Sequence, residues 1–314
     1  MMHAALLEFS PPAMPNAQAM MDRAGGENFP VAARVLSRRD RRHLLAIYGF
    51  ARLADELGDE LEGDRLAALD WLEQELDRAY AGDARHHLLL RLQATLAEHD
   101  LPREPLLRLI DANRLDQRVT RYETWEQLRA YCDLSANPVG ELVLCVFGLA
   151  SPERIALSNR VCTALQLTEH LQDVGEDLRR DRVYLPAEDL ARFGCSHEAL
   201  ARLGSRRGLD LDMDLWGVLP GSTGLNEDGR QAERLRDAIS FETARARELL
   251  AAGAPLVASI HGRPKLAVAA FVAGGRAALD AIERVGFDVL GGVRRASRPG
   301  RLRALASVLA ESRA

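Results

Sequence analysis

Alternating apolar and polar residues, the pattern of a β-strand, are nearly absent from this chain of 314 residues. Ala, Leu, Arg and Glu dominate instead, and apolar residues recur at helical spacing almost throughout. The sequence therefore predicts an all-α fold. No shift in composition divides the chain, so we expect one large helical domain over residues 27–314, after a mobile N-terminal tail over residues 1–26.

Caps and prolines indicate where the helices begin. Ser37 is an N-cap candidate, and Pro102, Pro152 and Pro264 stand where helices commonly start. Residues 204–229 are rich in Gly and Asp, which predicts a long loop. The expected helices cover residues 37–61, 64–81, 84–99, 103–119, 125–149, 152–179, 229–252, 263–288 and 300–312.

Charge and composition argue against several function classes. The net charge of −5 does not suggest nucleic acid as a partner, and no apolar run reaches the roughly 20 residues that span a bilayer. The N-terminus lacks the basic segment of a signal peptide, and the four cysteines show no CxxC spacing. A reducing, cytoplasmic location is expected, and the arginines within residues 294–303 would allow peripheral contact with anionic lipid at the inner face of the membrane.

Two segments carry acids four residues apart, which places them on one face of a helix. TEHLQDVGED contains Glu169, Asp173 and Asp177, and LLAIYGFARLADELGDE contains Asp55 and Asp59, with Tyr48 and Arg52 on the same stripe. Like charges at this spacing repel by roughly 0.2–0.5 kcal/mol per pair. A solvated helix face is the commonest explanation of either motif alone, and periodicity leaves the choice open.

Considered together, the two motifs favour a cation site. Facing helices with paired carboxylates would suit Mg²⁺, which prefers oxygen ligands and often bridges to a substrate phosphate. Nearby arginines could neutralise the remaining phosphate charge. These arginines are Arg52, Arg179, Arg180 and Arg182. A di-iron carboxylate site lacks its ExxH motif here, and no dinucleotide or P-loop motif is present.

With these motifs, and with AIY at 46–48, LQL at 165–167 and RVYLP at 182–186, the chain resembles the squalene/phytoene synthase family of head-to-head prenyltransferases. The resemblance extends from Glu27 to about Leu302. It implies a single all-α domain of the isoprenoid synthase type with a central active-site cavity. It also implies Mg²⁺ as cofactor and a prenyl diphosphate as substrate.

Within the family, ENFPVA at 27–32, SANPVG at 135–140 and TALQLT at 163–168 resemble the hydroxysqualene synthase branch of bacterial hopanoid biosynthesis. That branch converts presqualene diphosphate and water to hydroxysqualene and diphosphate. Other enzymes of the squalene and hopanoid pathway would then be partners. Two alternatives remain: a presqualene diphosphate or squalene synthase that condenses two farnesyl diphosphates, and a catalytically silent scaffold protein.

The resemblance also implies roles for single residues. Tyr48 and Arg52 would join the aspartates as catalytic residues, Gln166 and Tyr184 would line the phosphate end, and residues 142–147 would border the hydrocarbon pocket. Glu169 stands where the family usually has Asn, and Gln172 stands where it often has Arg. The implied metal ligands are Asp55, Asp59, Glu169, Asp173 and Asp177; the implied substrate-binding residues are Asn28, Phe29, Arg52, Asn137, Gln166 and Tyr184.

Overall fold

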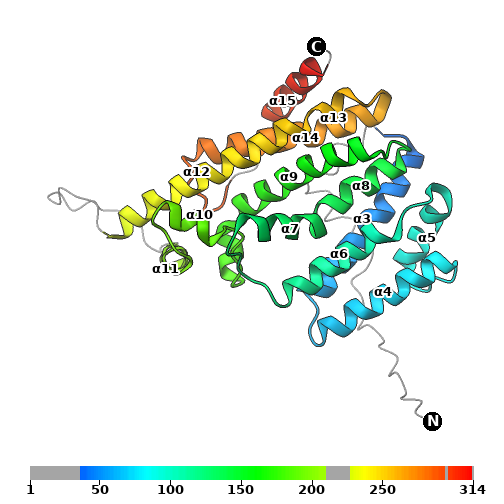
Figure 1. Ribbon diagram of the computed structural model, residues 1–314, viewed down its shortest axis with the longest axis horizontal. Helices are drawn as coiled ribbons and strands as arrows, with labels where there is room; N and C mark the ends of the chain where they lie inside the picture. The colour runs from blue at the N-terminus through cyan, green and yellow to red at the C-terminus, as the bar shows by residue number, and fades with distance from the viewer. Residues whose placement is uncertain (1–35, 210–226, 294–295, 313–314) are drawn as a thin grey trace, which may run out of the picture.

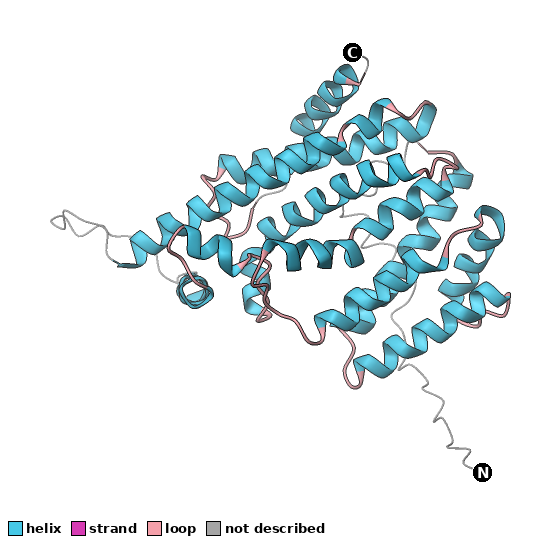
Figure 2. Cartoon of the chain, in the orientation of Figure 1, coloured by secondary structure: helices cyan, strands magenta, loops and turns pink. Residues whose placement is uncertain are grey.

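A computed structural model describes residues 36–209, 227–293 and 296–312. Every regular element in these ranges is a helix (Figure 2), and the one β-type contact there is an isolated bridge between Arg121 and Val183. The all-α prediction is confirmed. The helices are α3 (Arg38–Asp59), α4 (Arg65–Ala81), α5 (His87–His99), α6 (Arg103–Asp116), α7 (Trp125–Ser135), α8 (Asn137–Val146), α9 (Pro152–Arg179), α10 (Ala187–Arg192), α11 (His197–Leu209), α12 (Glu227–Gly253), α13 (Pro255–Ala258), α14 (Gly262–Arg284) and α15 (Arg298–Glu311).

Side-chain caps fix the two helices that matter most for the site. The Ser37 hydroxyl accepts a hydrogen bond from the Asp40 amide at 3.0 Å and starts α3. The Ser151 hydroxyl accepts from the Arg154 amide at 3.3 Å, and Pro152 opens α9, where its missing N–H costs nothing. The start of α3 and both ends of α9 therefore lie where the sequence predicts them.

Two sequence expectations were wrong. The single helix expected over residues 125–149 is divided into α7 and α8 at Ala136, because Pro138 cannot donate the backbone hydrogen bond that would continue α7. The loop expected from residue 204 begins later, since α11 continues through Gly204 to Leu209. Residues 210–226 and the tail over residues 1–26 lie outside the described residues.

The core has two parts, joined through α8. One cluster of buried apolar side chains comes mainly from α3, α4, α5 and α6, and the other is built around α9, α12 and α14. Figure 1 shows α9 between α12 and α8, with α4 and α5 at the opposite side of the molecule. Because α3 and α9 both pack against α8, their acidic faces are held at a fixed separation.

Gly175 marks a close approach in the wall behind α9. A Cβ atom at this position would overlap the backbone carbonyl oxygen of Leu290, in the segment that follows α14. The carbonyl is backbone and cannot turn away as a flexible side chain could. Only glycine fits here, between the two aspartates of the second acidic motif.

Within the described residues, no helix is both long and apolar enough to pass through a bilayer. All four cysteines are free thiols.

Candidate active site

A cavity of about 550 Å³ lies between α3 and α9, and a second one of about 330 Å³ extends deeper from it. Together they form what we call the acidic cavity. Gly274 and Ala278 of α14 border its outer part. Both parts are lined by Arg52, Asp55, Asp59, Glu169, Asp173 and Arg180.

The four motif aspartates all line the deeper part of the acidic cavity. Asp55 and Asp173 are exposed at its mouth, whereas Asp59 and Asp177, one turn further along each helix, are partly buried. Burial, and then repulsion from Asp173, raises the pKa of Asp177 to about 7. Burial and the neighbouring Asp173 therefore oppose the ionisation of Asp177, and a bound cation would favour it.

Arginines supply the opposing charge. Nη2 of Arg182, just after α9, lies 2.7 Å from Oδ1 of Asp59 at the end of α3. Burial alone would lower the pKa of Arg182, but this hydrogen bond and the negative charges of Asp59 and Asp116 together outweigh burial and raise it. Arg52 pairs with Glu60 at 3.1 Å and Arg180 with Glu176 at 3.0 Å, whereas Arg179 is exposed and lines neither part of the cavity.

The inner wall of the acidic cavity is aromatic. The Tyr184 ring stacks on His170, with the centroids 3.8 Å apart and the planes at 12°. Nε2 of His170 lies 3.1 Å from the Gln166 amide nitrogen, and burial lowers the pKa of His170 to about 3. His170 is therefore a neutral imidazole that accepts the Gln166 N–H and positions the amide.

Asp116 closes the same wall from α6. The Tyr131 hydroxyl donates a 2.9 Å hydrogen bond to Oδ2 of Asp116, and burial raises the pKa of this carboxyl to about 7. Its other oxygen, Oδ1, is buried with no hydrogen-bond partner among the described residues. Asn113, one turn earlier, donates to Oδ1 of Asp55 at 3.3 Å, so α6 contacts the first acidic motif directly.

A third cavity, of about 220 Å³, has an almost entirely apolar lining, and we call it the apolar cavity. Val143 and Leu144 contribute from the predicted stretch 142–147. Further apolar side chains come from α9 and α14 and include Val161, Leu165, Val268 and Phe271. Ser135, Gln166 and Glu169 line both this cavity and the deeper part of the acidic cavity, so the two adjoin at these residues.

The remaining predicted residues lie elsewhere. Tyr48 is half-buried on α3 and lines none of these three cavities. Asn137 is buried and also lines none of them: its amide donates to Asp133 at 2.6 Å and accepts from Thr163 at 3.1 Å. Asn28 and Phe29 lie outside the described residues.

Several residues of the site were not predicted from the sequence. Asn113, Asp116, Tyr131 and His170 all line the deeper part of the acidic cavity. Asn113 and Asp116 are three residues apart on α6, which is the one local signal that could have indicated them. Their approach to α9 depends on how α6 and α7 pack, and no spacing in the sequence encodes that.

The donor set fits the predicted cation. All five proposed ligands are carboxylates, whose hard oxygens suit Mg²⁺, and three of them, Asp55, Glu169 and Asp173, are exposed where a ligand can enter. The assignment of these residues as metal ligands stays a prediction.

Comparison with known proteins gives the family. The model of the squalene/phytoene synthase family matches residues 22–214 and 217–302. Hydroxysqualene synthase from Rhodopseudomonas palustris is 40% identical over 178 residues, 55% of this chain and 60% of that protein. Phytoene synthase from Arthrospira platensis is 29% identical over 278 residues, 84% of this chain and 82% of that protein.

Solved structures support the same family match. The crystal structure of squalene synthase HpnC from Alicyclobacillus acidocaldarius has a TM-score of 0.74 at 39% identity and covers 87% of this chain and 94% of that one. A dehydrosqualene synthase has a TM-score of 0.76 at 20% identity, which concerns the fold alone. Proteins of the matched family bind prenyl diphosphates and typically ionise them with the help of metal. Because the family model matches most of this chain, the chain belongs to the squalene/phytoene synthase family.

Proposed function

We propose that this protein is a hydroxysqualene synthase. In the reaction, the C–O bond of presqualene diphosphate breaks, diphosphate leaves with the electron pair, and the cyclopropylcarbinyl cation rearranges. Water then adds to the cation and loses a proton, which gives hydroxysqualene. One observation carries the proposal: a cavity rich in carboxylates and arginines adjoins an apolar cavity at Ser135, Gln166 and Glu169.

The acidic cavity would bind the diphosphate end. Asp55, Asp59, Asp173, Asp177 and Glu169 would hold Mg²⁺, which supplies Lewis-acid neutralisation of the leaving group's charge. Arg180 and Arg182 would contact the diphosphate oxygens that remain, since both line the cavity. Arg182 already pairs with Asp59 through Nη2, so its remaining N–H groups would be the ones to contact a phosphate while this pair is kept.

The apolar cavity would hold a prenyl chain and keep water away from the cation. Water must reach the cation at one place, and the junction of the two cavities is suited to this. There the Ser135 hydroxyl is buried with no hydrogen-bond partner among the described residues, beside the Gln166 amide and the Glu169 carboxylate. Polar atoms grouped in this way can hold a single water.

Product analysis tests the proposal. We expect the purified protein with Mg²⁺ to convert presqualene diphosphate to hydroxysqualene without NADPH, and ¹⁸O from labelled water to appear in the hydroxyl group. Squalene formed only when NADPH is present would instead show that a hydride quenches the cation. Failure of the intact protein to consume either presqualene diphosphate or farnesyl diphosphate would favour the scaffold alternative.

A squalene synthase is the second candidate. The HpnC structure, similar at 39% identity, is described as a squalene synthase, and the matched segment spans 60% of two of the hydroxysqualene synthases. Incubation with farnesyl diphosphate separates the two activities. Accumulation of presqualene diphosphate or squalene from it would move the function to the condensing enzymes.

Peripheral membrane contact is proposed on a separate observation. Leu302 on α15 is 67% exposed, and arginines precede and follow it in the sequence at 301 and 303. Figure 1 shows α15 at one edge of the molecule, beyond α14. Sedimentation with vesicles that contain anionic lipid, compared for the wild type and Leu302→Asp, tests this contact. Partnership with other enzymes of the pathway stays a prediction.

A further inference from the structure

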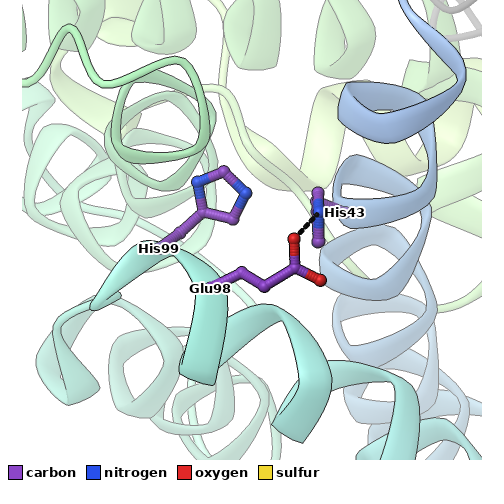
Figure 3. Close-up of side chains that lie close together, drawn as sticks. All are labelled: His43, Glu98 and His99. Atoms are coloured by element: carbon purple, nitrogen blue, oxygen red, sulfur yellow. Dashed lines mark ion pairs between the residues drawn. The ribbon is translucent and has the colours of Figure 1, made fainter.

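Three potential metal ligands meet where the start of α3 contacts the end of α5. Figure 3 shows Glu98 of α5 extending toward the His43 ring on α3, with the His99 ring nearby. One ligand atom from each of these three residues lies within 4.8 Å of the others. None of the three lines the acidic or the apolar cavity, so this group is separate from the proposed active site.

The hydrogen bonds of Thr95 fix the tautomer of His43. The Thr95 hydroxyl donates its one proton to the Arg91 carbonyl at 3.2 Å, so it can only accept from Nδ1 of His43 at 3.1 Å. The His43 proton is therefore on Nδ1, and Nε2 presents a lone pair. This is the arrangement of a ligating histidine, whose second nitrogen donates to a partner that orients the ring.

That lone pair faces an anion. Nε2 of His43 lies 3.2 Å from Oε2 of Glu98, and two acceptors at this distance require a proton or a cation between them. His43 is almost completely buried, so bulk water has little access to this nitrogen.

The His99 ring adds a nitrogen that has no hydrogen-bond partner among the described residues. This nitrogen, Nε2, is buried. The ring meets His43 edge to face, with centroids 4.4 Å apart and the planes at 71°. Two imidazole nitrogens and a carboxylate oxygen thus converge.

Two arginines now provide the positive charge. Nη2 of Arg42 lies 3.2 Å from Nε2 of His43 and 2.9 Å from Oε1 of Glu98, and Arg39 pairs with Glu98 at 3.2 Å. Both side chains are about two-thirds exposed, at 64% and 65%. They can turn into solvent when another cation takes their place.

We propose that His43, Glu98 and His99 form a binding site for Zn²⁺ or a similar divalent transition metal. In tetrahedral zinc sites with bonds of about 2.1 Å, neighbouring ligand atoms are about 3.4 Å apart, close to the 3.2 Å between His43 Nε2 and Glu98 Oε2. A small rotation of His99 would complete three ligands and leave the fourth position to water. The two nitrogen ligands select against Mg²⁺.

Zinc here would join α3 to α5. Because α3 also carries Asp55 and Asp59, the metal would fix the start of the helix on which the first acidic motif stands. Its effect would be on stability rather than on the chemical step, so binding can be measured without substrate and independently of the proposed function.

The experiment is competition for Zn²⁺ against a chromophoric chelator, combined with thermal unfolding of the full-length protein. We expect one tight Zn²⁺ per chain in addition to any weaker binding by the acidic cavity. Glu98→Gln and His99→Ala should each lower the affinity at least about tenfold, since even residues that only orient a ligand are worth about that much. His87→Ala, an exposed histidine on the same helix, should bind Zn²⁺ like the wild type.

Arg42→Ala provides the sharpest test. If the arginine occupies the place of a metal, its removal should tighten Zn²⁺ binding while lowering the stability of the metal-free protein. Co²⁺ bound at the site should show the visible absorption of a four- or five-coordinate ion, and this should disappear in His99→Ala. Equal Zn²⁺ affinity in the wild type, Glu98→Gln and His99→Ala would overturn the proposal, as would binding lost only in Asp173→Asn.

Discussion

The acidic cavity and the apolar cavity adjoin along α9 but differ in the chemical character of their linings. The earlier turns of α9 contribute Val161 and Leu165 to the apolar cavity, and its later turns contribute Asp173 and Asp177 to the acidic cavity. Glu169 lies between them and lines both. The contrast teaches that one continuous helix can set the distance between a charged leaving group and its hydrocarbon chain.

Asp173→Asn tests the role of the acidic cavity and has the largest expected effect of these variants. It removes one of the clustered charges while the helix stays intact, so we expect turnover to fall at least about 100-fold, as when one transition-state contact is lost. Helical content and the unfolding midpoint should change little, because surface carboxylates rarely shift stability beyond about 0.5 kcal/mol. Steady-state kinetics and thermal unfolding measure both.

Asp237→Asn is the matched control, since Asp237 is an exposed helical aspartate on α12 that lines none of the three cavities. Equal turnover in Asp173→Asn and Asp237→Asn would remove Asp173 from the catalytic residues. An unfolded Asp173→Asn protein would assign it a structural role.

The first acidic motif illustrates what the sequence could and could not predict. The spacing of Asp55 and Asp59 follows from helical geometry, and so does the expectation that both face one side. Whether that side meets α9 or solvent depends on α8, which packs against both helices and contains no local signal of this. The family resemblance supplied that step.

The same limit explains the residues that were missed. Asp116 and Tyr131 are joined by a hydrogen bond, but one ends α6 and the other lies on α7. The chain turns between these helices, and the turn decides which side chains meet. His43 and Glu98 are further apart in the sequence still, so their contact could be found only in three dimensions.

Cys162→Phe tests the role of the apolar cavity instead, because it fills part of that cavity. Cys162 lines the apolar cavity beside Gly140, where even a Cβ would meet its sulfur at 2.6 Å, so the space for a larger ring is small. The ring would occupy space that a long prenyl chain needs, so we expect kcat/KM for such a substrate to fall by about 10- to 100-fold, or about 1.4–2.7 kcal/mol of transition-state stabilisation. Overpacking should also lower the stability of the fold by about 1–3 kcal/mol. Mg²⁺ affinity should not change. Cys162→Ala is the control, and weakened Mg²⁺ binding in Cys162→Phe would contradict the separation of the two cavities.

Asp116→Asn tests the buried wall of the acidic cavity through the pH dependence of folding stability. The pKa of Asp116 is raised to about 7 by burial, so between about pH 4 and pH 7 the folded protein keeps a proton that the unfolded chain has lost. The stability contributed by the neutral carboxyl is therefore present at low pH and is lost as the pH rises through about 7. From pH 5 to pH 8 the metal-free wild type should lose more stability than Asp116→Asn, by on the order of 2 kcal/mol.

Urea unfolding at several pH values measures this difference. Asp177, whose pKa is also raised to about 7, contributes in the same window, so Asp177→Asn should reduce the pH dependence as well and the double variant should reduce it further. Parallel stability curves for the wild type and Asp116→Asn would mean that Asp116 is already ionised in the folded protein at low pH.

Glu169→Asn has the smallest expected effect and probes the boundary between the cavities. The amide keeps an oxygen ligand but removes one charge, so we expect weaker Mg²⁺ binding and turnover within about tenfold of the wild type. Glu169→Leu should cost more, because an apolar side chain can hold neither metal nor water. The measurement is a Mg²⁺ titration of thermal stability and rate. Identical curves for all three proteins would exclude Glu169 from the metal site.

Gly175 shows that a position between two aspartates of the acidic cavity can be intolerant of substitution for a structural reason alone. The carbonyl of Leu290 leaves no room for a side chain there, although position 175 itself takes no part in the proposed chemistry. In a library of random variants, a selection for folded protein would reject changes at Gly175 and accept changes at Asp173 and Asp177. A selection for product would reject all three. Comparing the two selections would therefore separate the positions that are required for folding of the cavity wall from the positions that are required for product formation.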